Sequence, residues 1–144
     1  RGAVMMKYLP ASQDIDFNEP RFRPFWERMA AAGLPLLSHT GGEHTIAVVR
    51  PALKSPHVLR LPLECGVTCI AAHSGSKGGL FDEDYVEELI GMMRAYPNLY
   101  ADTSAFNIPA RAHLLRRMQQ DPTVRSRMVH GSDYPVPTYG HWAW

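Results

Sequence analysis

The chain has 144 residues and a mass of 16.2 kDa, which is enough for one hydrophobic core of ordinary size. It carries 15 basic and 14 acidic side chains, so its formal net charge of +1 favours neither nucleic acid nor an anionic membrane surface. No apolar run approaches the roughly 18 residues of a membrane-spanning helix, and two cysteines are too few for a disulfide scaffold. We therefore expect a globular, cytoplasmic domain.

The ends of the sequence do not resemble the ends of a complete domain. The chain begins at Arg1 without an initiator Met or a signal-peptide pattern, and it enters a strand-like run almost at once. It ends at Trp144 without a helix stop signal. We expect the chain to be a piece of a longer protein.

The first half of the chain alternates predicted strands with predicted helices. Residues 3–9 form an apolar run typical of a short buried strand. Residues 20–32 carry Phe, Trp and Met at helical spacing and Pro only in the first turn, and Gly33 stands just past the end. A second strand follows over residues 34–39, and a weaker helix, interrupted by three prolines, over residues 51–63.

The second half repeats this alternation around a clearer helix. In the helix predicted over residues 82–95, Asp82 takes the N-cap position and Phe81 pairs with Val86 as a hydrophobic staple. The remaining predicted elements are strands at 67–73, 98–102 and 128–133 and a helix at 109–120.

The predicted strands end at regular intervals. Their ends fall near residues 7, 39, 73, 102 and 133, which are 29 to 34 residues apart, the length of one βαβ unit. Because the strands are continuous apolar runs, the pattern favours a parallel sheet flanked by helices. Eight such units make the roughly 250 residues of a TIM (β/α)8 barrel. We predict an α/β fold, an incomplete TIM barrel, as a single partial domain over residues 1–144.

Three side chains that can bind a metal end predicted strands: His39, His73 and Asp133. In a barrel these positions converge above the axis at the carboxyl ends of the strands. A single His there would most simply hydrogen-bond a loop backbone. Three ligand-type residues in register with the repeat instead favour a site for a divalent metal, with Zn²⁺ the best match to two imidazoles and a carboxylate.

Four motifs of the sequence resemble the amidohydrolase superfamily, and most closely its amidohydrolase-related branch of metal-dependent hydrolases and decarboxylases. They are Leu-Ser-His-Thr-Gly at 37–41, Ile-Ala-Ala-His-Ser-Gly at 70–75, Asn-Leu-Tyr-Ala-Asp-Thr-Ser-Ala at 98–105 and His-Gly-Ser-Asp-Tyr-Pro at 130–135. The resemblance covers nearly the whole chain as strands four to eight, the C-terminal portion of that barrel.

The resemblance implies a role for each strand-end residue. His39 matches the fifth-strand metal ligand. His73 matches the sixth-strand His, which either binds a second metal or acts on water and the substrate carbonyl. Asp133 matches the eighth-strand Asp, a metal ligand that also shuttles protons. The family's first-strand His-x-His pair has no counterpart, because no two His of this chain are separated by one residue.

Further candidates for the site have weaker patterns. Lys7 ends the fourth strand, where some superfamily members carry a carboxylated Lys that bridges two metals. Pairing with a substrate carboxylate, or simple contact with solvent, is the favoured interpretation for Lys7. His44 and Ser104 are candidate substrate contacts, although a solvated loop His and a backbone-capping Ser fit the same pattern. The five Arg residues between 111 and 127 are interpreted as a solvated helix face.

These residues predict a metal-dependent hydrolase that acts on a small molecule. The metal would activate water to attack an amide, ester or lactone carbonyl. Asp133 would accept the proton of the water, and His73 would polarise the carbonyl or assist deprotonation. Two alternatives stay open: a non-oxidative decarboxylase of the same barrel family, and an inactive truncated fragment that lacks the first-strand metal ligands. In either case a missing N-terminal barrel segment or an oligomer partner should cover the open edges of the sheet.

Overall fold

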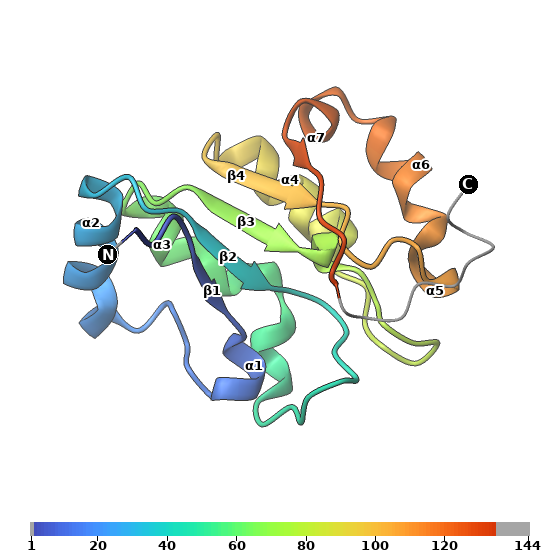
Figure 1. The fold of residues 1–144 in the computed structure, drawn as a ribbon, viewed down its shortest axis with the longest axis horizontal. Coiled ribbons are helices and arrows are strands. Elements are labelled where there is room, and N and C mark those ends of the chain that lie inside the picture. Colours follow the sequence, from blue (N-terminus) through green and yellow to red (C-terminus); the bar gives the residue numbers. More distant parts are fainter. Residues whose placement is uncertain (1, 135–144) are drawn as a thin grey trace.

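The structure, a computed structural model, describes residues 2–134 and forms one parallel sheet (Figure 1). Each strand pairs with the next one in the chain, in the order β1-β2-β3-β4-β5. A doubly wound sheet would reverse its strand order at a switch point, whereas sequential order is that of a barrel wall. The strands are β1 (Met6–Tyr8), β2 (Leu36–His39), β3 (Cys69–Ala72), β4 (Leu99–Asp102) and β5 (Met128–Val129).

Helical segments connect the strands, as the alternating pattern predicts. Gly33, just after the helix predicted over residues 20–32, has φ +62°, a conformation that glycine adopts without strain. Among residues 2–134, no helix is long and apolar enough to cross a membrane. The segments are α1 (Pro10–Gln13), η1 (Pro20–Phe22), α2 (Arg23–Ala31), η2 (Pro51–Lys54), η3 (Pro56–Leu59), α3 (Arg60–Glu64), η4 (His73–Gly75), α4 (Val86–Ala95), α5 (Pro109–Ala112), α6 (Leu114–Gln119) and α7 (Pro122–Ser126).

The start predicted for the helix over residues 82–95 is wrong. Helix α4 begins at Val86, and Asp82 does not cap it. The Asp82 carboxylate instead accepts hydrogen bonds from the backbone N–H groups of Gly78 and Gly79, both at 2.9 Å. Phe81 is fully exposed, so it forms no hydrophobic staple. The short loop after β3 therefore uses the residues that the sequence pattern assigned to the helix start.

Three other predicted boundaries also differ, each for a local reason. The helix predicted at 51–63 is three short segments, because prolines open two of them and Ser55 caps the second through the N–H of His57. The helix predicted at 109–120 is divided into α5 and α6. A further short helix, α7, follows, and the Asp121 carboxylate caps it through the N–H groups of Thr123 and Val124. The last strand ends at Val129 rather than continuing to residue 133.

The two faces of the sheet differ in burial. Leu36, Cys69 and Leu99 are each 0% exposed and belong to the core that helices such as α2 and α4 help to form. Figure 1 shows α3 and α4 behind the sheet. The adjacent residues Leu37, Ile70 and Tyr100 point to the other face, pair with one another in register and are only partly buried. One covered face and one more open face are what a section of a barrel wall presents.

Candidate active site

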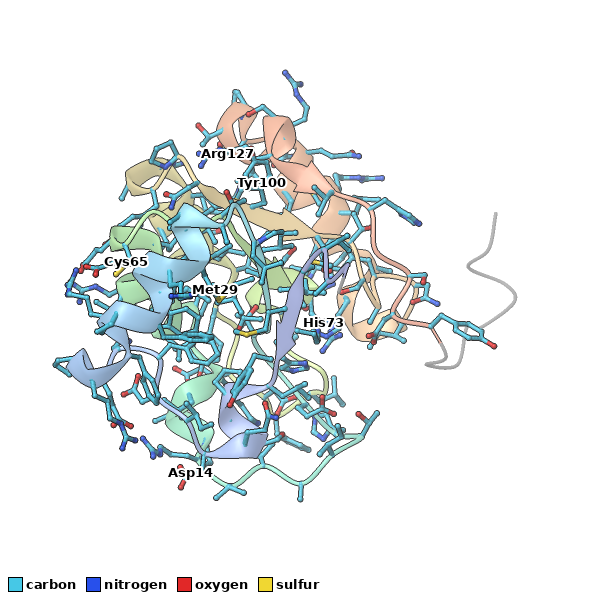
Figure 2. The ribbon with its side chains drawn as sticks, turned by 60° about the vertical axis from the view of Figure 1, so that its left-hand side comes forward. Asp14, Met29, Cys65, His73, Tyr100 and Arg127 are labelled. Atoms are coloured by element: carbon cyan, nitrogen blue, oxygen red, sulfur yellow. The ribbon has the colours of Figure 1, made fainter. Side chains whose placement is uncertain are left out.

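A pocket of about 220 Å³ opens where the strands end. Figure 2 places His73, which follows β3, well away from Cys65, which precedes that strand. The pocket therefore lies at the carboxyl-end side of the sheet, where barrel enzymes hold their chemistry. Its polar lining consists of Lys7, His39, Glu43, His44, Thr45, His73, Arg111 and Asp133.

His39, the last residue of β2, is buried with one ring nitrogen unsatisfied. Its Nδ1 lies 3.5 Å from Oε2 of Glu43. Its Nε2 is buried and has no hydrogen-bond partner among residues 2–134. Burial lowers the pKa of His39 to about 4, although the neighbouring Glu43 carboxylate opposes this shift. The imidazole is therefore neutral at pH 7, and its Nε2 can bind a ligand.

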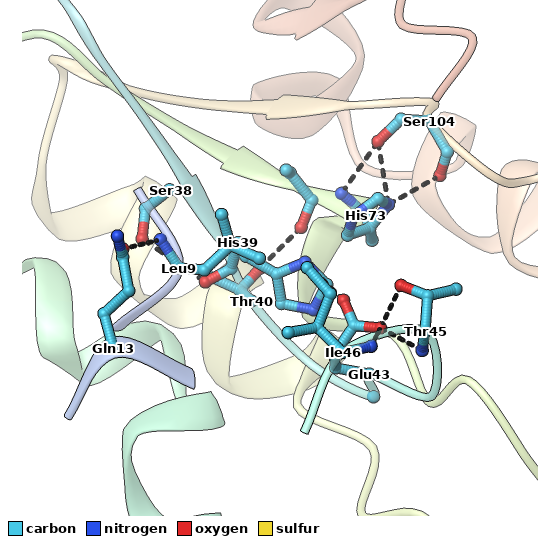
Figure 3. Close-up of polar contacts among 12 residues, drawn as sticks. Leu9, Gln13, Ser38, His39, Thr40, Glu43, Thr45, Ile46, His73 and Ser104 are labelled. Carbon is cyan, nitrogen blue, oxygen red and sulfur yellow. Dashed lines mark hydrogen bonds and ion pairs between the residues drawn. The ribbon is translucent and has the colours of Figure 1, made fainter. Parts of the chain in front are cut away.

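His73 lies directly beside His39 and is held by residues that follow β4. The two ring centroids are 4.6 Å apart. Nδ1 of His73 lies 2.9 Å from Oγ of Ser104 and 3.3 Å from its carbonyl oxygen (Figure 3). Burial, together with the nearby His39 and Arg111, lowers the pKa of His73 to about 2. This second imidazole is therefore also neutral at pH 7.

Unusual backbone conformations gather at this end of the sheet. Four non-glycine residues that follow strands have positive φ values: His73 at 63°, Ser74 at 53°, Ala105 at 59° and Asp133 at 60°. Such residues cost free energy and are found preferentially at functional sites. Three of the four line the pocket: His73, Ala105 and Asp133.

Asp133, which follows β5, and Lys7, in β1, bring opposite charges to the same pocket. Burial raises the pKa of the Asp133 carboxyl, and the positive charges of Lys7 and Arg111 oppose that shift. Burial also lowers the pKa of Lys7, against the carboxylates of Asp102, Asp133 and Glu43. Both residues line the same pocket as His39 and His73. The structure thus brings together all three strand-end candidates and Lys7.

The two other predicted substrate contacts lie at the edge of this arrangement. His44 lines the pocket, and its Nε2 is 2.6 Å from Oδ2 of Asp82. Ser104 is 4% exposed and lies behind His73, where its hydroxyl donates to Oδ1 of Asp102 at 2.6 Å. A substrate contact by Ser104 stays a prediction, whereas its contacts with His73 are direct.

The prediction that the basic stretch is a solvated helix face is wrong for Arg111, which is buried. Its side chain is 4% exposed and lines the pocket. Nη2 donates to the carbonyl of Gly42 at 2.8 Å, and Nε donates to the carbonyl of Lys77 at 3.1 Å. Arg111 therefore ties together the loops that follow β2 and β3, which no pattern in the sequence indicates.

Glu43 is a second pocket residue that the sequence pattern does not single out. Burial opposes its ionisation, but hydrogen bonds from the hydroxyl and N–H of Thr45 and the proximity of His39 hold its pKa below the ordinary value. A carboxylate beside Nδ1 of His39 orients that ring and increases the basicity of Nε2. The Gly-Gly-Glu-His run at 41–44 is the signal that could have pointed to it.

His39 is the described residue whose surroundings best suit a metal ligand. The unpartnered Nε2 of His39, with a carboxylate at the other ring nitrogen, is the arrangement typical of a zinc-binding His. No group of three or more His, Cys, Asp or Glu side chains within residues 2–134 is arranged to hold a metal ion. Since zinc sites use three or four protein ligands, a complete set would need donors beyond those placed here.

Comparisons with known proteins bear on the family and the fold of the chain. A family model described as "Amidohydrolase" matches residues 1–143. An uncharacterized TIM-barrel protein, Bb4693 from Bordetella bronchiseptica, is structurally similar, with a TM-score of 0.64 and 18% sequence identity. The match covers 96% of this chain and 52% of that protein, so the chain spans about half the length of the solved structure. The predicted α/β fold, an incomplete TIM barrel, is confirmed. A search of curated proteins found no match.

Proposed function

The chain belongs to the amidohydrolase family, and from that premise we propose that its pocket is the catalytic site of a metal-dependent hydrolase acting on an amide, ester or lactone. The carrying observation is the buried Nε2 of His39, which has no partner among residues 2–134 and lies in the same pocket as His73 and Asp133. Two neutral imidazoles and a carboxylate at strand ends are suited to binding a metal and moving protons.

The metal of this proposal is a divalent ion, with zinc the best match. His39 and Asp133 would hold it, with His73 as a further candidate ligand. Such an ion, when bound, lowers the pKa of water from about 15.7 to about 7 and makes hydroxide available at neutral pH. The donors that complete the ligand set would come from a further barrel segment or an oligomer partner.

Asp133 is the proposed proton acceptor. It lines the pocket together with Lys7, and burial raises its pKa above the ordinary value for Asp. A carboxylate whose pKa is raised accepts a proton from the attacking water more readily and can return it to the leaving group. His73 would polarise the scissile carbonyl or assist deprotonation, and Lys7 and His44 would contact the substrate.

A non-oxidative decarboxylase is the second candidate. Lys7 and Arg111 line the pocket, and both are cationic side chains that suit a substrate carboxylate. No carboxylate lies within 4.0 Å of the Arg111 guanidinium among residues 2–134. Measuring CO₂ release from a panel of aromatic and unsaturated carboxylic acids, beside hydrolysis of esters and lactones, separates the two reactions.

The test of the proposal is the Asp133→Asn variant of the full-length protein. We expect it to lose most of its turnover on any ester or lactone that the unmodified protein hydrolyses, because an amide cannot accept the proton. Asp84→Asn is the matched control, since Asp84 is exposed and contacts only the start of α4. Normal turnover in Asp133→Asn would overturn the role of Asp133. Metal-dependent activity in the full-length protein that the 144-residue chain alone lacks would favour the inactive-fragment alternative.

The substrate is proposed to be a small molecule, because the pocket volume is about 220 Å³. A cytoplasmic location is part of the proposal, supported by the free thiols of Cys65 and Cys69.

A further inference from the structure

Asp102, the last residue of β4, and Ser104, just after it, contact His73. They lie against its backbone N–H and against the Nδ1 edge of its ring. The backbone N–H of His73 donates to Oδ1 of Asp102 at 2.7 Å and approaches Oγ of Ser104 at 3.2 Å. Oδ1 of Asp102 also accepts from the N–H of Ser104 at 3.1 Å. Asp102 is 5% exposed, Ser104 4% and His73 3%. The three residues form a network shielded from water.

The network has one consistent arrangement of hydrogen atoms. The hydroxyl of Ser104 and Oδ1 of Asp102 are 2.6 Å apart, and an ionised carboxylate can only accept. The single hydroxyl proton of Ser104 therefore points to Asp102. Oγ of Ser104 then faces Nδ1 of His73, 2.9 Å away, with a lone pair. A hydrogen bond at this contact requires a proton on Nδ1.

The carbonyl of Ser104 leads to the same conclusion independently. Its oxygen lies 3.3 Å from Nδ1 of His73, and a carbonyl oxygen can only accept. An unprotonated Nδ1 would place its lone pair against both Ser104 oxygens. His73 is 3% exposed, and an imidazole shielded from water stays in its neutral form, so one ring nitrogen carries a proton and the other does not.

We infer that Asp102 and Ser104 are positioning residues that fix His73 as the Nδ1–H tautomer, so that Nε2 offers a lone pair to the pocket. This inference deepens the proposed function and rests on it for its catalytic meaning. His73 would then act as a base or as a ligand through Nε2. It would not polarise a substrate carbonyl, because that role needs an N–H at Nε2.

The arrangement of Ser, His and Asp is not that of a nucleophilic triad. In such a triad the Ser hydroxyl is free to attack and the Asp accepts a hydrogen bond from the His ring. Here the Ser104 hydroxyl is buried between the other two groups and is not among the pocket-lining residues. Ser104 therefore transmits the orientation set by Asp102 to the ring of His73.

The test is the tautomer of His73 in the metal-free full-length protein, measured at neutral pH by NMR with ¹⁵N-labelled histidine. The His73→Gln variant assigns the signals, since its spectrum lacks those of His73. We expect proton coupling at Nδ1 and the downfield shift of an unprotonated nitrogen at Nε2. A proton on Nε2 in the unmodified protein would overturn the inference, whatever the protein's activity.

Variants then test the positioning role. Ser104→Ala should shift the His73 signals toward a mixture of the two tautomers, and Ser104→Thr, which keeps the hydroxyl, should restore the original pattern. Ser126→Ala is the control, because Ser126 is an exposed serine of α7 that contacts only its own helix. An unchanged tautomer in a folded Ser104→Ala protein would overturn the role of the Ser104 hydroxyl, because the backbone carbonyl of residue 104 remains in that variant. A correct tautomer in a protein without hydrolase activity would instead count against the proposed function alone.

Discussion

The rings of His39 and His73 lie 4.6 Å apart between centroids, with their planes inclined by 60°. This contact follows from the sheet, because β2 and β3 pair in parallel with His39 opposite Ala72, the residue before His73. Both rings are buried and neutral at pH 7. The pocket is therefore organised by strand register, and its remaining wall depends on the loops that follow the strands.

The contact between the loops after β2 and β3 predicts an effect of Gly42→Ala. A Cβ at Gly42 would lie 2.1 Å from the backbone nitrogen of Gly78 and 2.3 Å from Oδ2 of Asp82. Because backbone cannot move aside cheaply, we expect the free energy of unfolding to fall by about 1–3 kcal/mol in urea denaturation.

Gly91→Ala is the matched control for this change. Gly91 lies within α4, and a Cβ there would meet no atom within 4 Å. This substitution should raise the free energy of unfolding by about 0.5–1 kcal/mol. Equal stabilities for Gly42→Ala and the unmodified protein would show that the two loops do not pack as described.

Arg111→Ala should loosen the same loops. The substitution removes the donors to the carbonyls of Gly42 and Lys77. Hydrogen bonds from a charged group are worth about 1.5–3 kcal/mol, so amide hydrogen exchange over residues 41–46 and 76–79 should accelerate roughly tenfold or more. Arg116→Ala, at an exposed position of α6, should leave exchange in both loops unchanged. Slow exchange in Arg111→Ala would contradict the bridging role.

The two buried imidazoles predict that metal-free protein loses stability on mild acidification. Burial lowers the pKa of His39 to about 4 and that of His73 to about 2, from an ordinary value of 6.5. Between pH 6.5 and pH 5 the unfolded chain binds protons that the folded chain does not, so the free energy of unfolding falls as the pH falls. Each fully shifted His contributes up to about 1.4 kcal/mol per pH unit.

Urea denaturation at several pH values measures this slope. His73→Gln should reduce it, because glutamine does not titrate. His113→Gln, which replaces an exposed His, should leave it unchanged. A stability that does not change between pH 6.5 and pH 5 would contradict the burial of both rings in their neutral form.

The sequence predicts the fold well where its signals are repeated along the chain. Strand ends near residues 7, 39, 73 and 102 agree with β1 to β4, because apolar runs of parallel strands differ clearly from the polar loops that follow. Helix starts are predicted less well. Asp82 and Phe81 have the residue types of a cap and a staple, yet the loop after β3 takes the Asp82 carboxylate for its own N–H groups.

The candidate site is predictable only in the part that belongs to the strands. His39 ends β2 and His73 directly follows β3, so their convergence can be read from spacing, and Asp133 reaches the same pocket from the loop after β5. Arg111 and Glu43 reach the pocket from a helix and a loop, whose directions depend on tertiary packing. A periodic pattern does not contain that information, so it predicts a solvated side chain for the buried Arg111.

The most direct test of the central claim, that His39 and its pocket form part of a metal-dependent active site, is the zinc affinity of the full-length protein measured by competition with a chromophoric chelator. We predict that the unmodified protein and the control His113→Asn bind zinc alike, and that His39→Asn binds it at least about tenfold more weakly. Equal zinc affinity in His39→Asn and the unmodified protein would contradict the claim.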